Sequence, residues 1–143
     1  MQKDSLASKM ARIQAWSEGK GRYKISLTLF NTGRGISAVL IGGDSPHIGG
    51  VVLAVPRPSL TGDGYSADDF VIPVPHHKDV EVAKPIAHAL ACTCRAPVTL
   101  SAGIHSDDLT REEIDLIKKN CDQVLQLALQ TLKKEVPDNN RQH

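Results

Sequence analysis

Apolar and polar residues alternate near the start of the chain, in a pattern that begins at Tyr23. Apolar side chains occupy every second position through Leu29, and this period of two predicts a half-buried strand. A glycine-containing turn at residues 31–35 separates this segment from a second apolar run at residues 36–41. The two segments therefore predict a β-hairpin.

The middle of the chain predicts two further strands on either side of a long loop. Residues 48–56 are almost continuously apolar, which is typical of a strand at the centre of a sheet. Residues 57–69 are rich in proline, serine, glycine and aspartate, so we expect a surface loop that serves a binding site. Residues 70–74 form a short strand, and Pro73 favours a place at the sheet edge.

Two helical patterns and one more strand complete the chain. Apolar residues recur at helical spacing from Val80 to Leu90, but Pro85 lacks the backbone donor of a helix interior. This helix therefore either begins late, near residue 84, or is kinked. After a strand at residues 96–102, Thr110 and Glu113 have the spacing of a capping box. The apolar stripe beyond them predicts a long helix that ends near residue 134.

The order of these elements predicts an α+β fold. We expect a mostly antiparallel sheet of five to six strands with two helices packed on one face. Residues 21–136 are assigned to a single α+β ligand-binding domain, between a polar lead at residues 1–20 and a disordered tail at residues 137–143. A short helix is expected over residues 6–16. A long amphipathic helix on a small sheet leaves apolar surface over, so we expect a homodimer.

Composition excludes several classes of partner. The chain has 143 residues and a formal net charge of +1, and a nucleic-acid binder that neutralises phosphates would need a basic face. Aromatic residues make up only 3% of the chain, too few for stacking platforms for single-stranded nucleic acid. No apolar run approaches the roughly 20 residues that cross a bilayer. We therefore expect no nucleic-acid and no membrane partner.

The cysteines and the first residues favour a cytoplasmic location. The three cysteines, an odd number, provide no disulfide framework, and the polar first 20 residues lack a signal-peptide pattern. Cys92 and Cys94 have a Cys-x-Cys spacing that does not favour zinc. Cys121 falls on the apolar face of the second helix, where we expect a buried, inert thiol.

The residues best suited to binding a ligand lie in two glycine-histidine segments at strand ends. Residues 42–50 contain His47, and residues 101–108 contain His105. Glycines let a backbone approach a ligand closely, and histidine can donate, accept or bind metal. His105 also precedes a helix N-terminus, which favours an anion such as phosphate. We therefore expect both segments to share one pocket.

Two cations strengthen the expectation of a phosphate-bearing ligand. Arg57, held between two prolines, suits a bidentate phosphate contact, and Lys78 lies near a helix start. The assignments of Arg57 and His47 each have a structural alternative of equal weight. Arg57 can be a solvent-exposed residue that begins a loop, and His47 can tie down its own loop by a bond to a backbone carbonyl.

A metal-dependent enzyme acting on small molecules is the main alternative function. Its ligands would be His47, His77 and His105, but no His-x-x-x-His or carboxylate pattern supports a metal site. His76 and His77 point to opposite sides of an extended chain, so only one of them can join the others. No nucleophile elbow and no acid–base pair stands out. The residues favour a binding protein over an enzyme.

Three motifs occur in order along most of the chain. They are Gly42-Gly43-Asp44-Ser45-Pro46-His47-Ile48-Gly49, then His77-Lys78 before a helix, then Ala102-Gly103-Ile104-His105 before the capping box. Together they resemble the LpdD-like family of prenylated-flavin chaperones, over roughly residues 22–130. The resemblance implies a dimeric fold like that of proteasome assembly chaperones. It also implies a non-catalytic protein that binds prenylated FMN, or FMN, for UbiD-type decarboxylases, which makes a decarboxylase and a flavin prenyltransferase its expected partners.

The resemblance also implies a set of cofactor-binding residues. His76 departs from the family pattern, because we expect glycine before His77-Lys78, and a backbone contact there is therefore in question. A third hypothesis is an assembly chaperone that holds a partner protein and no ligand. No catalytic or metal-binding residue is assigned, and the expected cofactor-binding residues are Gly43, His47, Ile48, Gly49, Arg57, His77, Lys78, Gly103, Ile104 and His105.

Overall fold

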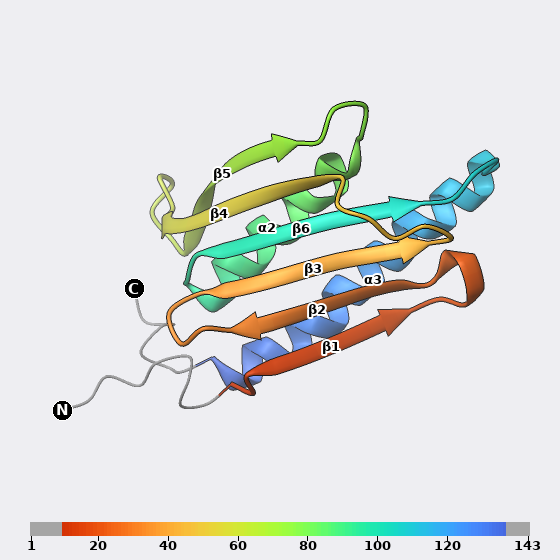
Figure 1. The fold of residues 1–143 in the computed structure, drawn as a ribbon. Coiled ribbons are helices and arrows are strands. Elements are labelled where there is room, and N and C mark those ends of the chain that lie inside the picture. Colours follow the sequence, from red (N-terminus) through yellow and green to blue (C-terminus); the bar gives the residue numbers. More distant parts are fainter. Residues whose placement is uncertain (1–9, 137–143) are drawn as a thin grey trace.

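The computed structural model describes residues 10–136, which form one sheet with two helices on one of its faces (Figure 1). The helices are α2 (Asp79–Cys94) and α3 (Arg111–Glu135), and a short 3-10 helix, η1, spans Gly21–Tyr23. The strands are β1 (Ile13–Glu18), β2 (Ile25–Asn31), β3 (Ile36–Gly43), β4 (Gly50–Pro58), β5 (Tyr65–Pro73) and β6 (Val98–His105). None of the described helices is long and apolar enough to cross a membrane.

The sheet has the strand order β1-β2-β3-β6-β4-β5. Among the described strands, every pair of neighbours is antiparallel except β3 and β6, which run in parallel. The predicted α+β class, the mostly antiparallel sheet of six strands and the two helices on one face are confirmed. The predicted hairpin is also confirmed as β2–β3, and β5 lies at a sheet edge as expected.

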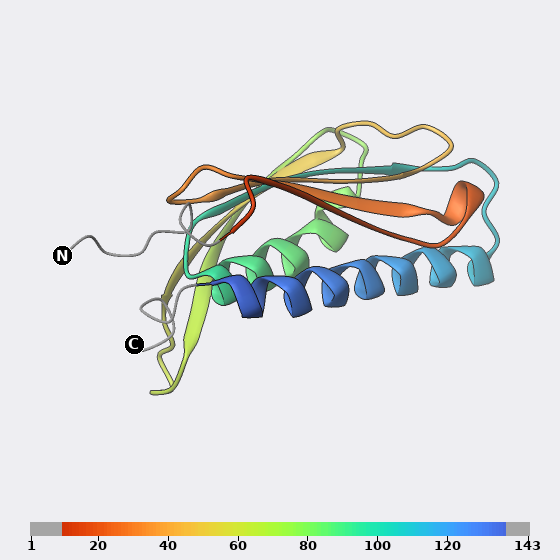
Figure 2. The same ribbon diagram turned by 90° about the horizontal axis from the view of Figure 1, so that it is seen from below.

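The core lies between the sheet and the two helices (Figure 2). Side chains at alternate positions of each strand point toward the helices, so Ile25, Leu27 and Leu29 of β2 are completely buried. Val124 and Leu132 of α3 meet the core from the other side. Removing these aliphatic side chains from water stabilises the fold at roughly 25 cal/mol per Å² of buried apolar surface.

The N-terminal lead differs from the prediction, because its last part belongs to the sheet. Ile13–Glu18 pairs with β2 along its whole length, and Trp16 packs against the core. Residues 10–16 therefore do not form the expected helix: pairing with β2 buries Trp16, and local pattern alone does not reveal such a partner. The remainder of the expected helix and the tail at residues 137–143 lie outside the described residues.

Two further boundaries differ. The expected loop at residues 57–69 is mostly strand, since β4 and β5 pair from Pro58 opposite Tyr65 to Gly50 opposite Pro73. Helix α2 begins at Asp79, so the late start near residue 84 is wrong and Pro85 lies inside the helix. The proline removes one backbone bond, but the burial of Ala83, Ile86, Ala87 and Leu90 on this helix outweighs the loss.

Candidate functional site

The parallel pair β3–β6 brings the two glycine-histidine segments together. Gly43 at the end of β3 is in register with His105 at the end of β6, and parallel strands have their carboxyl ends at one edge. The chain after β3 must then pass over the end of β6 to enter β4. Three backbone bonds tie this crossing loop to β6, from Ser45 N to His105 O at 3.0 Å, from His47 N to Gly103 O at 3.5 Å and from Gly49 N to Ala102 O at 2.7 Å.

The glycines of these segments allow the protein to pack closely against itself. A Cβ on Gly103 would lie 1.6 Å from the carbonyl oxygen of His47, and one on Gly49 would lie 1.8 Å from the carboxylate of Asp79. Gly43 has a φ of +84°, which glycine adopts without strain. The space beside Gly49 and Gly103 is therefore filled by the protein, and not held open for a ligand.

Three histidines from separate parts of the chain converge at this edge. The ring centroids of His47 and His77 lie 4.8 Å apart, and those of His47 and His105 lie 6.1 Å apart. His77 arrives on the segment before α2, where its Nδ1 donates to the carbonyl of Pro75 at 3.0 Å. The Nε2 of His105 lies 2.9 Å from the carboxylate of Asp107.

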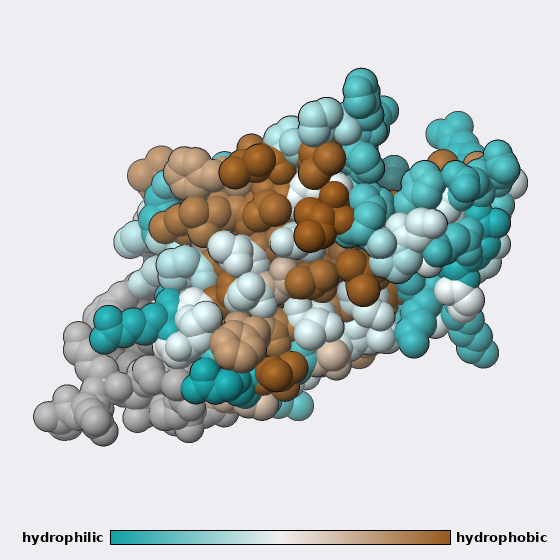
Figure 3. Space-filling model, viewed as in Figure 1, coloured by the Kyte–Doolittle hydropathy of each residue, from teal (hydrophilic) through white to brown (hydrophobic). Residues whose placement is uncertain are grey.

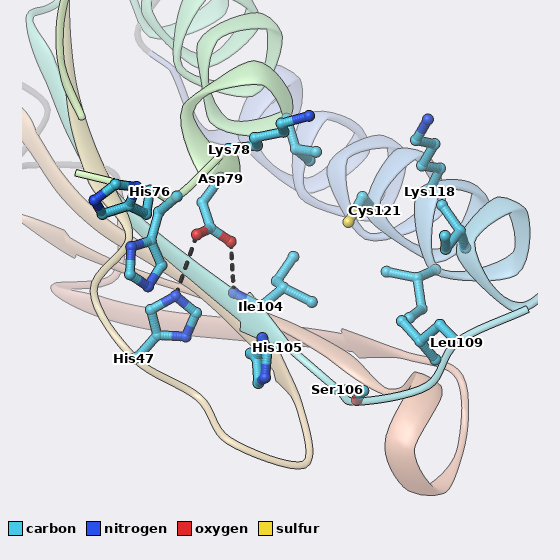
Figure 4. A pocket seen from close by; sticks show the side chains of 14 residues that line it. His47, His76, Lys78, Asp79, Ile104, His105, Ser106, Leu109, Lys118 and Cys121 are labelled. Atoms are coloured by element: carbon cyan, nitrogen blue, oxygen red, sulfur yellow. Dashed lines mark hydrogen bonds and ion pairs between the residues drawn. The ribbon is translucent and has the colours of Figure 1, made fainter. Parts of the chain in front are cut away.

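Asp79, the first residue of α2, fixes the arrangement from the start of that helix. Its side chain is only 10% exposed, with one oxygen 3.2 Å from His47 Nε2 and the other accepting from the Ile104 amide at 2.9 Å (Figure 4). The Nδ1 of His47 faces the carbonyl of Ser45 at 3.1 Å. Both ring nitrogens therefore face oxygen atoms, which fixes the orientation of the imidazole.

His76 adopts a backbone conformation that normally requires glycine. Its φ is +68°, within the left-handed region that strains most residues with a side chain. This is the position at which the sequence resemblance led us to expect glycine. The backbone before α2 therefore has the conformation expected of a glycine at this position, although the residue is His76.

A cavity of about 270 Å³ lies between the end of β6 and the first turns of α2 and α3. One side is polar and carries the three converging histidines and Lys78. Figure 4 shows Leu109 and Cys121 across the cavity from His47 and His105. Lys118 adds a second ammonium group, and the apolar wall consists of Val82, Ile104, Leu109, Ile114 and Ile117.

The predicted capping box is present at the start of α3, the helix that lines one side of the cavity. The Thr110 hydroxyl accepts from the Glu113 amide at 3.2 Å, and the Glu113 carboxylate accepts from the Thr110 amide at 3.1 Å. The helix therefore starts at a defined residue, and Ile114 and Ile117 fall one and two turns along the pocket wall.

Half of the expected cofactor-binding residues line this cavity. They are His47, His77, Lys78, Ile104 and His105, whereas Gly43, Gly49 and Gly103 shape the backbone that holds them. Ile48 lies on the crossing loop with 62% of its surface exposed, outside the pocket lining.

The structure does not bring Arg57 to the cavity. Arg57 lies seven residues along β4 from Gly50, or about 23 Å of extended chain, and its Nε donates to Asp68 at 2.9 Å. Asp79, Ser106, Leu109 and Lys118 line the cavity and were not predicted. Asp79 gave no distinct signal, since an acidic residue in a first helical turn is ordinary.

The chemistry of the cavity differs from that of a metal or thiol centre. Burial raises the pKa of the Cys121 thiol to about 12, so this side chain stays protonated at neutral pH. Among residues 10–136, no three His, Cys, Asp or Glu side chains are arranged to hold a metal ion. Ammonium and imidazole groups beside an aliphatic wall instead suit an anionic ligand with an apolar part.

The chain is similar in sequence to a known protein family and similar in fold to a solved structure. Residues 19–133 match the family model of the prenylated flavin chaperone LpdD-like domain. The fold is similar to a chain in the crystal structure of a chaperone complex for yeast 20S proteasome assembly, with a TM-score of 0.53 and 16% identity. That similarity covers 89% of this chain and 100% of the other. No curated protein matches the chain.

Proposed function

The chain belongs to the LpdD-like domain family of prenylated flavin chaperones, and on this premise we propose that it binds prenylated FMN without catalysis. The proposed clients are UbiD-type decarboxylases, which receive the cofactor made by a flavin prenyltransferase. The prenylated flavin supplies the chemistry of decarboxylation only in such an enzyme. The role proposed for this chain is to hold the cofactor for that enzyme.

The polar side of the cavity supports a contact with the flavin phosphate. Lys78 is an ammonium donor next to His77, whose Nδ1 is used by the Pro75 carbonyl, so its Nε2 is oriented away from that bond. His47 adds a further imidazole to the same cluster, held between the Ser45 carbonyl and the Asp79 carboxylate. Charge-assisted bonds to phosphate are among the stronger polar contacts available to a protein.

The apolar side supports a contact with the ring system. Ile104, Leu109 and Ile117 offer aliphatic surface of the kind that an isoalloxazine and its prenyl-derived ring would bury. The cavity volume of about 270 Å³ is near the lower end of ligand pockets, which span roughly 300–1,000 Å³. We therefore propose that one part of the cofactor is buried while another stays accessible, which suits a protein that must release its ligand.

The observation that carries the proposal is the convergence of His47, His77 and His105 on one cavity with an aliphatic wall. The same geometry does not favour the metal-dependent enzyme. Both ring nitrogens of His47 face oxygen atoms of the protein, so a metal would have to displace one of these partners.

The test is to co-express the chain with a flavin prenyltransferase and measure the absorption spectrum and the mass of any released ligand. We expect a bound flavin of prenylated mass. Titration with flavin should then show affinities reduced about tenfold or more in His47→Ala and His105→Ala. His88→Ala is the matched control, because His88 of α2 pairs with Asp69 of β5 and does not line the cavity.

Two results would contradict the proposal. Unchanged flavin affinity in both His47→Ala and His105→Ala would show that this cavity is not the flavin site. A colourless wild-type protein that captures the decarboxylase in a pull-down, yet binds neither FMN nor its prenylated form, would replace cofactor binding by assembly of a partner protein. We further propose that the protein is a cytoplasmic homodimer.

A further inference from the structure

Lys118 lines the cavity from α3 and was not among the residues predicted to bind a ligand. Lys78, the N-cap residue of α2, lines the same cavity from the other helix. Figure 4 shows the ammonium groups of both lysines on the side of the cavity that the two helices form. Two positive charges from distant parts of the chain therefore border one cavity.

Neither ammonium group is neutralised by an acidic side chain of the described residues. Asp115 and Asp122 lie three residues before and four residues after Lys118, where neighbours on a helix can pair. Within residues 10–136, neither of them forms an ion pair with Lys118, and Lys78 also makes no ion pair. The positive charge of both lysines is therefore available to a ligand.

The acidic residue of the cavity lining is engaged elsewhere. Asp79 directs one carboxylate oxygen to His47 and the other to the Ile104 amide, and its side chain is only 10% exposed. The remaining lining consists of histidine, lysine, serine, cysteine and aliphatic side chains. Because two lysines outweigh one aspartate, an anion that enters the cavity meets a positive potential.

The opposite face of the described sheet is apolar, and its arginine is paired. Figure 3 shows this face, where apolar side chains gather over β3, β4 and β5. The alternation along β4 turns Arg57 toward it, and Asp68 accepts from the Arg57 Nε at 2.9 Å. An anion therefore finds unpaired cations beside an apolar cavity on the helix side of the sheet.

The charge of a phosphate group distinguishes its esters. A phosphate monoester carries about two negative charges at neutral pH, because its second pKa is about 6. A phosphodiester carries one charge, because it has no second ionisable oxygen, and an alcohol carries none. Lysine is a point charge with three donors on a flexible stem, so two lysines can reach one phosphate group from different helices.

We infer that Lys78 and Lys118 together select a ligand with a terminal phosphate monoester, and that Lys118 is the residue that determines this specificity. The aliphatic wall, which includes Ile104, Ile114 and Ile117, takes the apolar part of the same ligand. The inference deepens the proposed function and rests on it for the flavin. FMN ends in such a phosphate, whereas riboflavin ends in a hydroxyl group.

Flavin fluorescence titrations test the inference on the full chain, with FMN and riboflavin as probes. We expect the wild type to bind FMN about tenfold more tightly than riboflavin. Lys118→Met keeps the apolar stem of the side chain and removes its charge. The affinity for FMN should therefore fall about fivefold, while the affinity for riboflavin stays unchanged. Lys119→Met is the matched control, because Lys119 is the next residue of α3 and does not line the cavity.

Two flavin results would overturn the inference. Equal losses of affinity for FMN and riboflavin in Lys118→Met would mean that Lys118 shapes the cavity and does not recognise the phosphate. An unchanged affinity for FMN in this variant would mean that the phosphate lies elsewhere. Circular dichroism shows whether each variant is folded, and Lys118→Gln provides the same test if Lys118→Met does not fold.

A probe without flavin separates this inference from the cofactor role. If the wild type binds neither FMN nor riboflavin, the cofactor role fails, and titration with butyl phosphate by amide NMR decides the inference. Saturable shifts at Ile117 and Lys118 that are lost in Lys118→Met, and are smaller with dimethyl phosphate, would uphold it. No shifts with butyl phosphate, or equal shifts with both phosphate esters, would overturn it as well.

Discussion

His47 and Asp79 are 32 positions apart in the chain, yet His47 Nε2 lies 3.2 Å from the Asp79 carboxylate. The same carboxylate accepts the amide proton of Ile104 at 2.9 Å. Asp79 therefore ties the crossing loop, the end of β6 and the start of α2 to one side chain. This junction positions the histidine cluster, and the cavity depends on it.

Replacement of Asp79 should separate its two roles. Asp79→Ala leaves the Ile104 amide without its partner, and we expect the free energy of unfolding to fall by about 2 kcal/mol. Asp79→Asn keeps an oxygen that can accept from this amide, so its loss should be smaller. Chemical denaturation and hydrogen exchange at Ile104 measure both effects. Wild-type exchange in Asp79→Ala would show that the carboxylate does not hold the strand end.

Gly103 is predicted to tolerate no side chain. In Gly103→Ala the new Cβ would lie 1.6 Å from the carbonyl oxygen of His47, so the crossing loop must move. We expect a loss of at least about 2 kcal/mol in unfolding free energy and weaker flavin binding. Ser101→Ala, on the same face of β6, is the control and should stay near wild type. Equal melting temperatures for the two variants would contradict the predicted clash.

His76 is predicted to be replaceable by glycine with a gain in stability. Because its φ of +68° strains a side chain, His76→Gly should raise the unfolding free energy by about 1 kcal/mol. Asp63→Gly is the control, since Asp63 is not among the residues with a positive φ, and there glycine should lower stability slightly. A destabilised His76→Gly variant would mean that the imidazole contributes more than its backbone strain removes.

Tyr23 and Glu113 are predicted to make stability depend on pH. The Tyr23 hydroxyl donates to the Glu113 carboxylate at 2.5 Å, and this bond is the largest cause of both shifts. It lowers the pKa of Glu113 below its ordinary 4.5 and raises the pKa of Tyr23 above its ordinary 10.0. The contribution of Glu113 is therefore complete above pH 4.5 and is lost as acid protonates the carboxylate.

The contribution of Tyr23 has the opposite sign, since it is complete below pH 10 and is lost as base removes the phenolic proton. Denaturation across pH 2–7 in the wild type and in Tyr23→Phe measures the acid limb. We expect the variant to lose less stability on acidification, because the hydroxyl that favours the Glu113 carboxylate is missing. Parallel pH profiles would show that this bond does not distinguish the folded from the unfolded state.

Local patterns in the chain predicted much of the architecture. The alternation from Tyr23 to Leu29 identified β2, and the spacing of Thr110 and Glu113 identified the start of α3 to the residue. Both signals depend on neighbours within a few positions, where side-chain direction and backbone bonding are set by the residue types themselves. β1 was missed because its short apolar alternation becomes a strand only beside β2.

The sequence by itself determined the types of β2 to β6 and of both α-helices, the helix start at Thr110 and the presence of two histidine-bearing segments. Only the tertiary structure decided that β6 inserts in parallel between β3 and β4. That insertion places His47 near His105 and brings Asp79 into contact with His47, while it leaves Arg57 at the far end of β4. The physical reason is that strand order depends on burying whole faces against the helices, and periodicity within one strand carries no information about its neighbour.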